Sequence, residues 1–343
     1  MNEAYVTGIL DNPVGKIKQV STVWSAKDIW STIKVRWSIG RMNYRLRPGL
    51  YAVGTPGEDS EIYVTGNFKL SFDHLRRALD GMDAWILVLD TKGINVWCAA
   101  GKGTFGTKEL VYRIKAHKLD LLVSHRKVIV PQLGAVGVAA HEVKDRTGFR
   151  VIYGPVRAED IKAFVTSGLR ATPEMRKVQF TLLDRMKLIP VELAYGGYYL
   201  LLIPAIFFIL SGLHSQGYSV DIAWSNGGKA IINLIGAYLA GCVITPMLLP
   251  WIPFKRFSLK GLVIGWIIAG VLALYHFSGN NSIEIVSWFL IIGGISSFLA
   301  MNFTGSSTFT SLSGVQKEMK LSLPLQIIAI GIGFIGWIIT RFI

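Results

Sequence analysis

Residues 84–102 read AWILVLDTKGINVWCAAGK, and this stretch decides how the first half of the chain folds. Residues 84–89 form a nearly continuous apolar run, which is typical of a strand buried on both faces of a sheet. The segment 91–107 follows this strand and opens a helix. Because open α/β sheets bind ligands at the carboxyl ends of their strands, the sequence predicts that Cys98 lies at the ligand-binding edge of a sheet.

The rest of the first 180 residues alternates between strand-like and helix-like segments. The predicted strands are 61–65, 127–130 and 149–153, and the predicted helices are 71–79 and 107–117, with Ser71 and Thr107 as their N-cap residues. Such alternation favours an α/β domain with a largely parallel sheet. We therefore expect a Rossmann-like domain over residues 1–180.

The second half of the chain, residues 181–343, has the composition of a membrane domain. The whole chain is 51% hydrophobic and only 17% charged, with a mean hydropathy of +0.42. A helix needs about 20 apolar residues to cross a bilayer. Five stretches are long enough, near 191–213, 229–251, 259–278, 283–303 and 323–342. We therefore expect an all-α membrane domain of about five transmembrane helices.

The charges predict the orientation of this membrane domain. Lys and Arg residues precede the first span and lie between spans two and three and between spans four and five, which puts the first domain in the cytoplasm and the C-terminus outside. No signal-peptide pattern opens the sequence. We expect a multi-pass protein of the cytoplasmic (inner) membrane. Residues 1–190 carry +11 of the net charge of +14, which suits anionic membrane lipid. No motif indicates nucleic acid as a partner.

The chain has two cysteines, Cys98 and Cys242, and Cys242 lies in a predicted span. They make no disulfide framework, which fits a reducing compartment for the first domain. A free cysteine is most often a buried structural residue, whereas a thiolate favoured by a nearby cation such as Lys102 can be a nucleophile or a metal ligand. From Cys98 alone, both interpretations remain open.

The glycines after Cys98 resemble nucleotide-binding patterns only superficially. Gly101, Gly103 and Gly106 satisfy G-x-G-x-x-G, but the dinucleotide fingerprint needs its glycines directly after a strand and an acidic residue about 20 positions later. Position 126 is Arg, and a Walker A loop fails because Val96 stands in place of its first glycine. Glycine also lets a backbone approach a flat, bulky ligand, which is the role we expect here.

The segment from Asn95 to Lys102, continuing through Thr107, resembles the cap-helix segment of the membrane-bound corrinoid protein of microbial mercury methylation. That family is related to the large subunit of the corrinoid iron–sulfur protein. The resemblance implies a cobalamin-type corrinoid cofactor in the first domain. It also implies that Cys98 is the catalytic residue and the lower axial ligand of the cobalt.

The resemblance assigns further roles around the ring. Asn95 would cap the short helix, Val96 and Trp97 would pack it against the sheet, and Ala99, Ala100 and Gly101 would leave room for the corrin. The remaining candidate cofactor-binding residues lie in this segment or in other strand-end loops, and are Lys102, Gly103, Thr104, Gly106, Thr65, Gly66, Asn67, Gln132, Gly134 and Gly154.

The function implied is that of a corrinoid-dependent methyltransferase, which moves a methyl group from the cofactor to inorganic Hg(II) and forms methylmercury. An iron–sulfur cluster normally needs about four cysteine ligands, so electrons would come from a separate small ferredoxin that could also deliver Hg(II). The methyl group would come from a methyl-tetrahydrofolate-linked donor. Two alternatives remain, a membrane-anchored methyl carrier of the acetyl-CoA pathway type and a non-enzymatic, nucleotide-binding membrane sensor.

Overall fold

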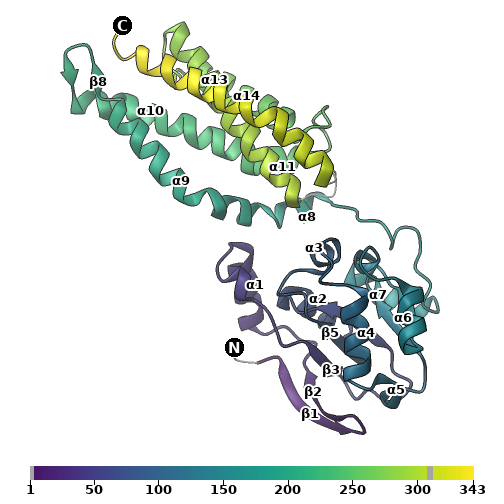
Figure 1. The fold of residues 1–343 in the computed structure, drawn as a ribbon. Coiled ribbons are helices and arrows are strands. Elements are labelled where there is room, and N and C mark those ends of the chain that lie inside the picture. The colour runs from purple at the N-terminus through teal and green to yellow at the C-terminus, as the bar shows by residue number, and fades with distance from the viewer. Residues whose placement is uncertain (1–3, 307–311) are drawn as a thin grey trace. The chain divides into compact units, whose positions relative to one another are not determined.

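The computed structural model describes residues 4–306 and 312–343, and the chain divides into two compact units. One unit comprises residues 1–35 and 39–179, and the other comprises residues 36–38 and 180–343. The first unit is an α/β domain and the second is a bundle of helices (Figure 1).

A seven-stranded mixed sheet forms the centre of the first unit, with the order β1-β2-β3-β5-β4-β6-β7. The strands are β1 (Val6–Asn12), β2 (Gly15–Val20), β3 (Gly49–Val53), β4 (Ile62–Gly66), β5 (Ala84–Leu89), β6 (Lys127–Val130) and β7 (Arg150–Tyr153). The pairs β1–β2 and β3–β5 are antiparallel, and the other neighbouring pairs are parallel. The sheet is therefore mostly parallel, as predicted.

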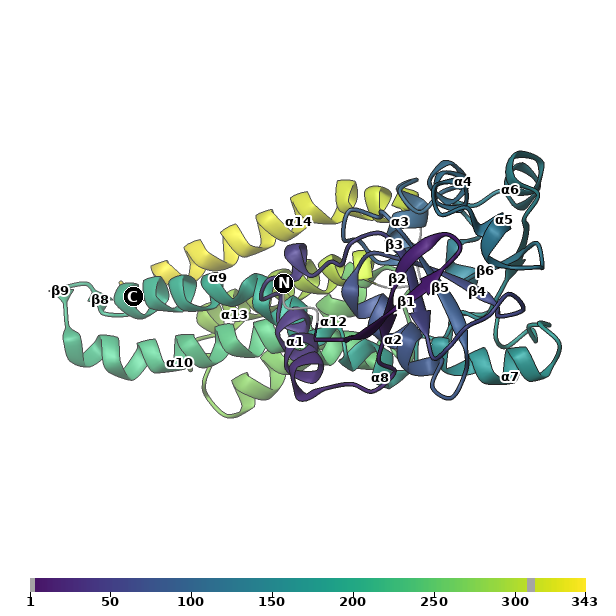
Figure 2. The ribbon, with the colours of Figure 1, turned by 90° about the horizontal axis from the view of Figure 1, so that it is seen from below.

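Helices cover both faces of this sheet, which lies between α2 and α4 in Figure 2. The helices of the first unit are α1 (Ala26–Arg36), η1 (Arg41–Asn43), α2 (Lys69–Ala78), α3 (Val96–Gly101), α4 (Thr107–Ala116), α5 (Leu119–Leu122), η2 (Gln132–Gly134), α6 (Ala140–Thr147), η3 (Ala158–Asp160) and α7 (Ile161–Thr166). Side chains of α2 and α7 share one buried cluster with the sheet, and side chains of α3 to α6 share the other.

Strand β5 shows why the apolar run at 84–89 is so continuous. Trp85, Leu87 and Leu89 belong to the cluster under α3 to α6, whereas residues 84, 86 and 88 belong to the cluster under α2 and α7. All six side chains are at most 2% exposed. Successive side chains of a strand point to opposite faces, so a strand with helices on both sides needs apolar residues at every position.

The four predicted strands are confirmed as β4 to β7, but β1, β2 and β3 were not predicted. β1 and β2 form an antiparallel hairpin at the sheet edge, and their many partly or fully exposed side chains leave no long apolar run. The two predicted N-caps were wrong. Helix α2 begins at Lys69, ahead of Ser71, and Gly106 rather than Thr107 caps α4. The Thr107 hydroxyl instead accepts a hydrogen bond from Ala139 N at 2.8 Å.

The second unit has, within its described residues, five helices long and apolar enough to cross a membrane. Its elements are α8 (Leu182–Met186), α9 (Ile189–Leu210), β8 (Leu213–His214), β9 (Gly217–Tyr218), α10 (Val220–Leu239), the π-helical turn η4 (Ala240–Ile244), α11 (Thr245–Leu248), α12 (Phe257–Leu274), α13 (Ser282–Asn302), η5 (Phe303–Ser306) and α14 (Leu312–Ile339). Helix α13 packs against α10, α12 and α14 (Figure 1). The expected number of apolar helices is confirmed.

Two of these helices begin earlier than the predicted spans. The second starts at Val220 instead of near 229, and the helix of the fifth span, α14, starts at Leu312 instead of near 323. Hydropathy marks only the apolar part of a helix, whereas the helix itself continues into polar residues at its end. The Ser219 hydroxyl, for example, accepts a hydrogen bond from Ile222 N and caps α10 ahead of its apolar stretch.

Small residues let α12 and α13 pack closely. A methyl group added at Gly261 would lie 2.5 Å from Ser296 O, and one at Gly265 would lie 3.0 Å from Ile292 O. The Ser296 hydroxyl also donates a hydrogen bond to Gly261 O at 2.7 Å. Glycines four residues apart are a common way for membrane helices to bring their backbones together.

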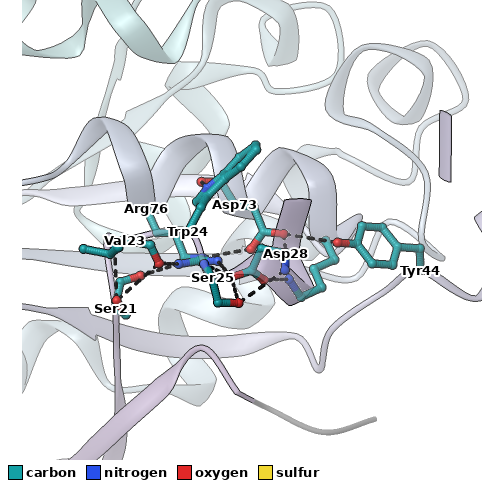
Figure 3. A network of polar contacts seen from close by, with 9 residues as sticks. Ser21, Val23, Trp24, Ser25, Asp28, Tyr44, Asp73 and Arg76 are labelled. Carbon is teal, nitrogen blue, oxygen red and sulfur yellow. Dashed lines mark hydrogen bonds and ion pairs between the residues drawn. The ribbon is translucent and has the colours of Figure 1, made fainter. Parts of the chain in front are cut away.

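A buried network of charges attaches α1 to α2 (Figure 3). The Asp28 carboxylate pairs with Lys69 Nζ at 2.9 Å and with Arg76 Nη2 at 3.0 Å, and both cations also pair with Asp73. Burial raises the pKa of Asp28, but hydrogen bonds from Lys69 and Ser25 outweigh this effect and hold that pKa well below its usual range. Asp28 is therefore ionised at neutral pH.

The attachment of α1 should depend on pH through Asp28. A depressed pKa stabilises the folded state above the ordinary aspartate pKa of about 4, and this stabilisation is lost as the pH falls through the depressed value. We expect D28N to weaken hydrogen-exchange protection of the α1 amides by about 3 kcal/mol at pH 7, with the difference from wild type narrowing only in acid. An equal difference at pH 7 and in strong acid would contradict this.

Candidate functional site

The carboxyl ends of β4 and β6 form a topological switch point. From β4 the chain crosses through α2 to β5 on one side, and from β5 it crosses through α3, α4 and α5 to β6 on the other side of β4. Open α/β sheets bind ligands in the crevice at such a point. Helix α3 contacts both β4 and η2. The segment that carries Cys98 therefore lies at the edge where this fold places its ligands.

Helix α3 is fixed at its start by the residue expected to cap it. Asn95 Oδ1 accepts a hydrogen bond from Cys98 N at 2.9 Å, which confirms Asn95 as the N-cap. Such a cap accepts a hydrogen bond from a backbone N–H in the first turn, for which the helix itself supplies no carbonyl acceptor. The Cys98 side chain is exposed. The thiol thus lies on the solvent side of a short, capped helix.

The other side of α3 packs into the core. Val96, Ala99 and Ala100 are at most 7% exposed, whereas Trp97 is 41% exposed. The expectation that Trp97 packs against the sheet was wrong, and Ala99 and Ala100 are part of the core. Residues three and four positions apart share a helix face, so burying Val96 together with both alanines turns residues 97 and 98 outward. A methyl group added at Gly101 would meet nothing within 4 Å.

Asn67, at the end of β4, holds the loop that leads into α3. Its side chain is 2% exposed, and Oδ1 accepts hydrogen bonds from Thr91 N at 3.0 Å, Thr91 Oγ1 at 2.9 Å and Gly93 N at 2.9 Å. Its amide nitrogen donates to Asp90 Oδ1 at 3.2 Å. Asn67 therefore orders the loop between β5 and α3, and its expected contact with a cofactor stays a prediction.

Three glycines permit close packing around this loop and α3. A methyl group added at Gly66 would lie 2.8 Å from Thr91 Oγ1, and one at Gly134 would lie 2.4 Å from Phe105 Cε1. At Gly137, which the sequence reasoning missed, it would lie 2.1 Å from Phe105 O and 3.2 Å from Ala100 Cα. Only the three-dimensional contact with Phe105 distinguishes Gly137 from the other loop glycines, so the sequence alone held no signal for it.

The other candidate residues fall into buried and exposed groups. Thr65, Gly106 and Gly154 are buried, Thr104 and Gln132 are partly buried, and Lys102 and Gly103 are exposed. Gln132 stands apart, because within the described residues its Oε1 is a buried oxygen with no hydrogen-bond partner. Buried polar atoms are normally paired, so this oxygen, carried by η2 beside α3, has capacity for a donor from a ligand.

The pattern G-x-G-x-x-G does not occupy the position of a dinucleotide fingerprint. Gly101 ends α3, Gly103 lies in the following turn with φ of 78°, and Gly106 caps α4. Strand β5 ends at Leu89, so the glycines do not form the tight turn directly after a strand that pyrophosphate binding requires.

One charged group at this edge has a perturbed pKa. Burial raises the pKa of Asp90, but hydrogen bonds from the side chain and backbone of Lys92 outweigh it and lower the pKa below its usual range. Lys92 Nζ lies 2.6 Å from Asp90 Oδ2. The carboxylate is therefore ionised at neutral pH and accepts hydrogen bonds that shape the loop before α3.

Replacing Asn67 with alanine should loosen this loop. The change leaves the Thr91 and Gly93 amides without their acceptor, which costs about 2 kcal/mol for buried donors. We expect faster hydrogen exchange over residues 91–101 in the N67A protein. As a matched control, N95A removes only the α3 cap and should speed exchange only in the first turn of α3. Unchanged exchange at residues 91–94 in N67A would show that Asn67 does not hold the loop.

Comparison with known proteins finds a family match within the first unit. The family model of the CO dehydrogenase/acetyl-CoA synthase delta subunit matches residues 35–165, a range that includes α3 and the strands β3 to β7. It does not extend into the apolar helices.

Curated relatives agree with this match. The acetyl-CoA decarbonylase/synthase complex subunit gamma of Archaeoglobus fulgidus is 31% identical over 142 residues, or 40% of this chain and 30% of the relative. The corrinoid/iron–sulfur protein large subunit of Moorella thermoacetica is 32% identical over 127 residues, or 36% of this chain and 28% of the relative. The chain thus spans only about a third of each relative's length. Part of the chain is homologous to subunits of acetyl-CoA synthase complexes and of the corrinoid iron–sulfur protein.

Proposed function

We propose that the chain is a membrane-anchored corrinoid protein in which the Cys98 thiolate is the lower axial ligand of the cobalt. The single observation that carries this proposal is the position of Cys98. It is exposed on a capped helix at the switch point of a sheet, in a unit homologous to a corrinoid/iron–sulfur protein large subunit.

The residues around Cys98 fit a flat ring with amide substituents. Gly101, on the exposed side of α3, leaves open space above the helix. The buried Gln132 Oε1 has no hydrogen-bond partner within the described residues, and an amide of a corrin side chain could donate to it. Thiolate sulfur is an established ligand for redox-active metals, as in haem proteins with an axial cysteine. The donor set and the local shape therefore both suit a corrinoid.

The protein's own residues would position the sulfur. Asn95 fixes the start of α3, and the burial of Val96, Ala99 and Ala100 fixes its rotation, so that the thiol faces outward. Asn67 holds the preceding loop against β4. When bound, the corrinoid would supply a cobalt-bound methyl group for transfer, with the axial sulfur as an electron-rich donor to the metal.

The acceptor that we propose is inorganic Hg(II), with methylmercury as the product. This follows from the resemblance of residues 95–107 to the mercury-methylation family, and from the presence of apolar helices and only two cysteines in the chain. An electron-rich axial thiolate suits transfer to an electrophile such as a soft metal ion. A separate small ferredoxin would supply electrons and could deliver Hg(II), and a methyl-tetrahydrofolate-linked protein would supply the methyl group. The first unit would face the cytoplasm and the C-terminus the outside.

A second candidate is a methyl carrier that serves acetyl-CoA synthesis or cleavage. The names of the relatives favour it, since several of them, including the one from Archaeoglobus fulgidus, are subunits of an acetyl-CoA decarbonylase/synthase complex. The two proposals share the corrinoid and Cys98 and differ only in the acceptor. Offering the methyl-loaded protein Hg(II) or an acetyl-CoA synthase therefore separates them.

The role of Cys98 can be tested on the purified full-length protein loaded with methylcobalamin and given Hg(II), with its cysteines kept reduced. We expect C98A to change the cobalt absorption spectrum and to reduce methylmercury formation to background. The buried Cys242 provides the matched control, because C242A should leave both readouts near wild type. A C98A protein that methylates Hg(II) normally would refute the proposed role, and loss of cobalamin binding by C242A but not C98A would reverse the assignment.

A further inference from the structure

Helix α1 turns its apolar side outward. Ile29, Trp30 and Ile33 are 51%, 58% and 43% exposed, whereas Asp28 and Thr32 are buried together with Val35. An ordinary surface helix does the reverse and places its apolar stripe against the core. Further along the same unit, Ile39 and Met42 are also exposed, at 62% and 79%. We call these five side chains the α1 apolar face.

The buried charges fix this orientation. Asp28 pairs with Lys69 and Arg76 beneath the helix, and Ser25 N and Oγ hydrogen-bond to the same carboxylate (Figure 3). Rotating α1 to bury Ile29 and Ile33 would draw Asp28 away from both cations. The outward direction of the apolar side chains is therefore built into the fold.

Apart from the buried Asp28, the charged residues from Lys27 to Arg47 are all positive. Lys27 and Lys34 are exposed on α1, and no acidic residue occurs between Asp28 and Glu58, a segment that holds Lys34, Arg36, Arg41, Arg45 and Arg47. Lys34 Nζ lies 5.5 Å from the centre of the Trp30 ring. Exposed tryptophan and isoleucine beside lysine and arginine are the composition of a helix that lies in the headgroup region of a membrane.

We propose that α1 and the following residues to Met42 bind the anionic surface of the membrane that the apolar helices of this chain would cross. The apolar side chains enter the boundary between headgroups and acyl chains, and the surrounding lysines and arginines contact lipid phosphates. The membrane is the favoured occupant because the same chain carries five helices able to span one, and because the positive charge complements anionic lipid. This inference is independent of the corrinoid and of the acceptor.

Spin labels in full-length protein in lipid nanodiscs test the proposal. A single cysteine replaces Ile33 in a protein carrying C98S and C242A, and the matched control places it at Tyr112 on α4, which is 59% exposed. Accessibility to oxygen, which concentrates in lipid, is compared with accessibility to a water-soluble nickel chelate. In nanodiscs of phosphatidylcholine and phosphatidylglycerol, we expect the label at 33 to favour oxygen and the label at 112 to favour the chelate.

Charge reversal at the two exposed lysines, K27E with K34E, should shift the label at 33 toward the chelate. Replacing phosphatidylglycerol with phosphatidylcholine should do the same. A label at 33 that is as open to the chelate as the label at 112 would overturn the proposal. So would a label shielded from both reagents, since that result would mean that protein, either the helical unit or a second copy of the chain, covers this face.

Discussion

The buried amide of Asn67 links the sheet to the segment that carries Cys98. Strand β5 must be apolar on both faces, and its chain then has to leave the core through a polar loop whose amides need partners. Asn67, at the end of the neighbouring β4, supplies one oxygen for three donors of that loop. The loop in turn fixes where α3 begins, and the cap at Asn95 and the buried alanines fix how it is rotated. Cys98 faces outward as a consequence of these constraints.

Much of the fold could be predicted from the hydrophobic pattern of the sequence, and the wrong or missing predictions have identifiable physical causes. The strands β4 to β7 are apolar enough to stand out, whereas β1 and β2 form a partly exposed edge hairpin and β3 inserts between that hairpin and β5 by an antiparallel pairing with β5. Topology of this kind depends on long-range contacts that local pattern does not encode. The second and fifth apolar helices begin in polar residues, where hydropathy gives no signal.

At the site, sequence could locate the segment but not its packing. The resemblance implied that Asn95 caps the short helix, and the structure confirms it, since a cap acts through local side-chain chemistry. Trp97 was predicted on the wrong side because the rotation of a six-residue helix about its axis depends on which of its side chains pack into the core. Here Val96, Ala99 and Ala100 are the buried ones. The roles of Asn67, Gly134 and Gly137 are set by neighbours far away in the sequence. The outward orientation of the apolar side chains of α1 could likewise not be predicted from the sequence, since it results from the pairing of Asp28 with Lys69 and Arg76.

The chain combines an exposed thiol on a fixed helix, a unit homologous to subunits of corrinoid and acetyl-CoA synthase systems, and apolar helices that suit a membrane. The proposed function depends on a bond between Cys98 sulfur and cobalt. Cobalt X-ray absorption on the purified full-length protein loaded with cobalamin reports the atoms bound to the metal directly. We expect a sulfur atom bound to cobalt in the wild-type protein and none bound to cobalt in the C98A protein. A metal surrounded only by nitrogen and oxygen, with the same spectrum in both proteins, would contradict the proposed bond.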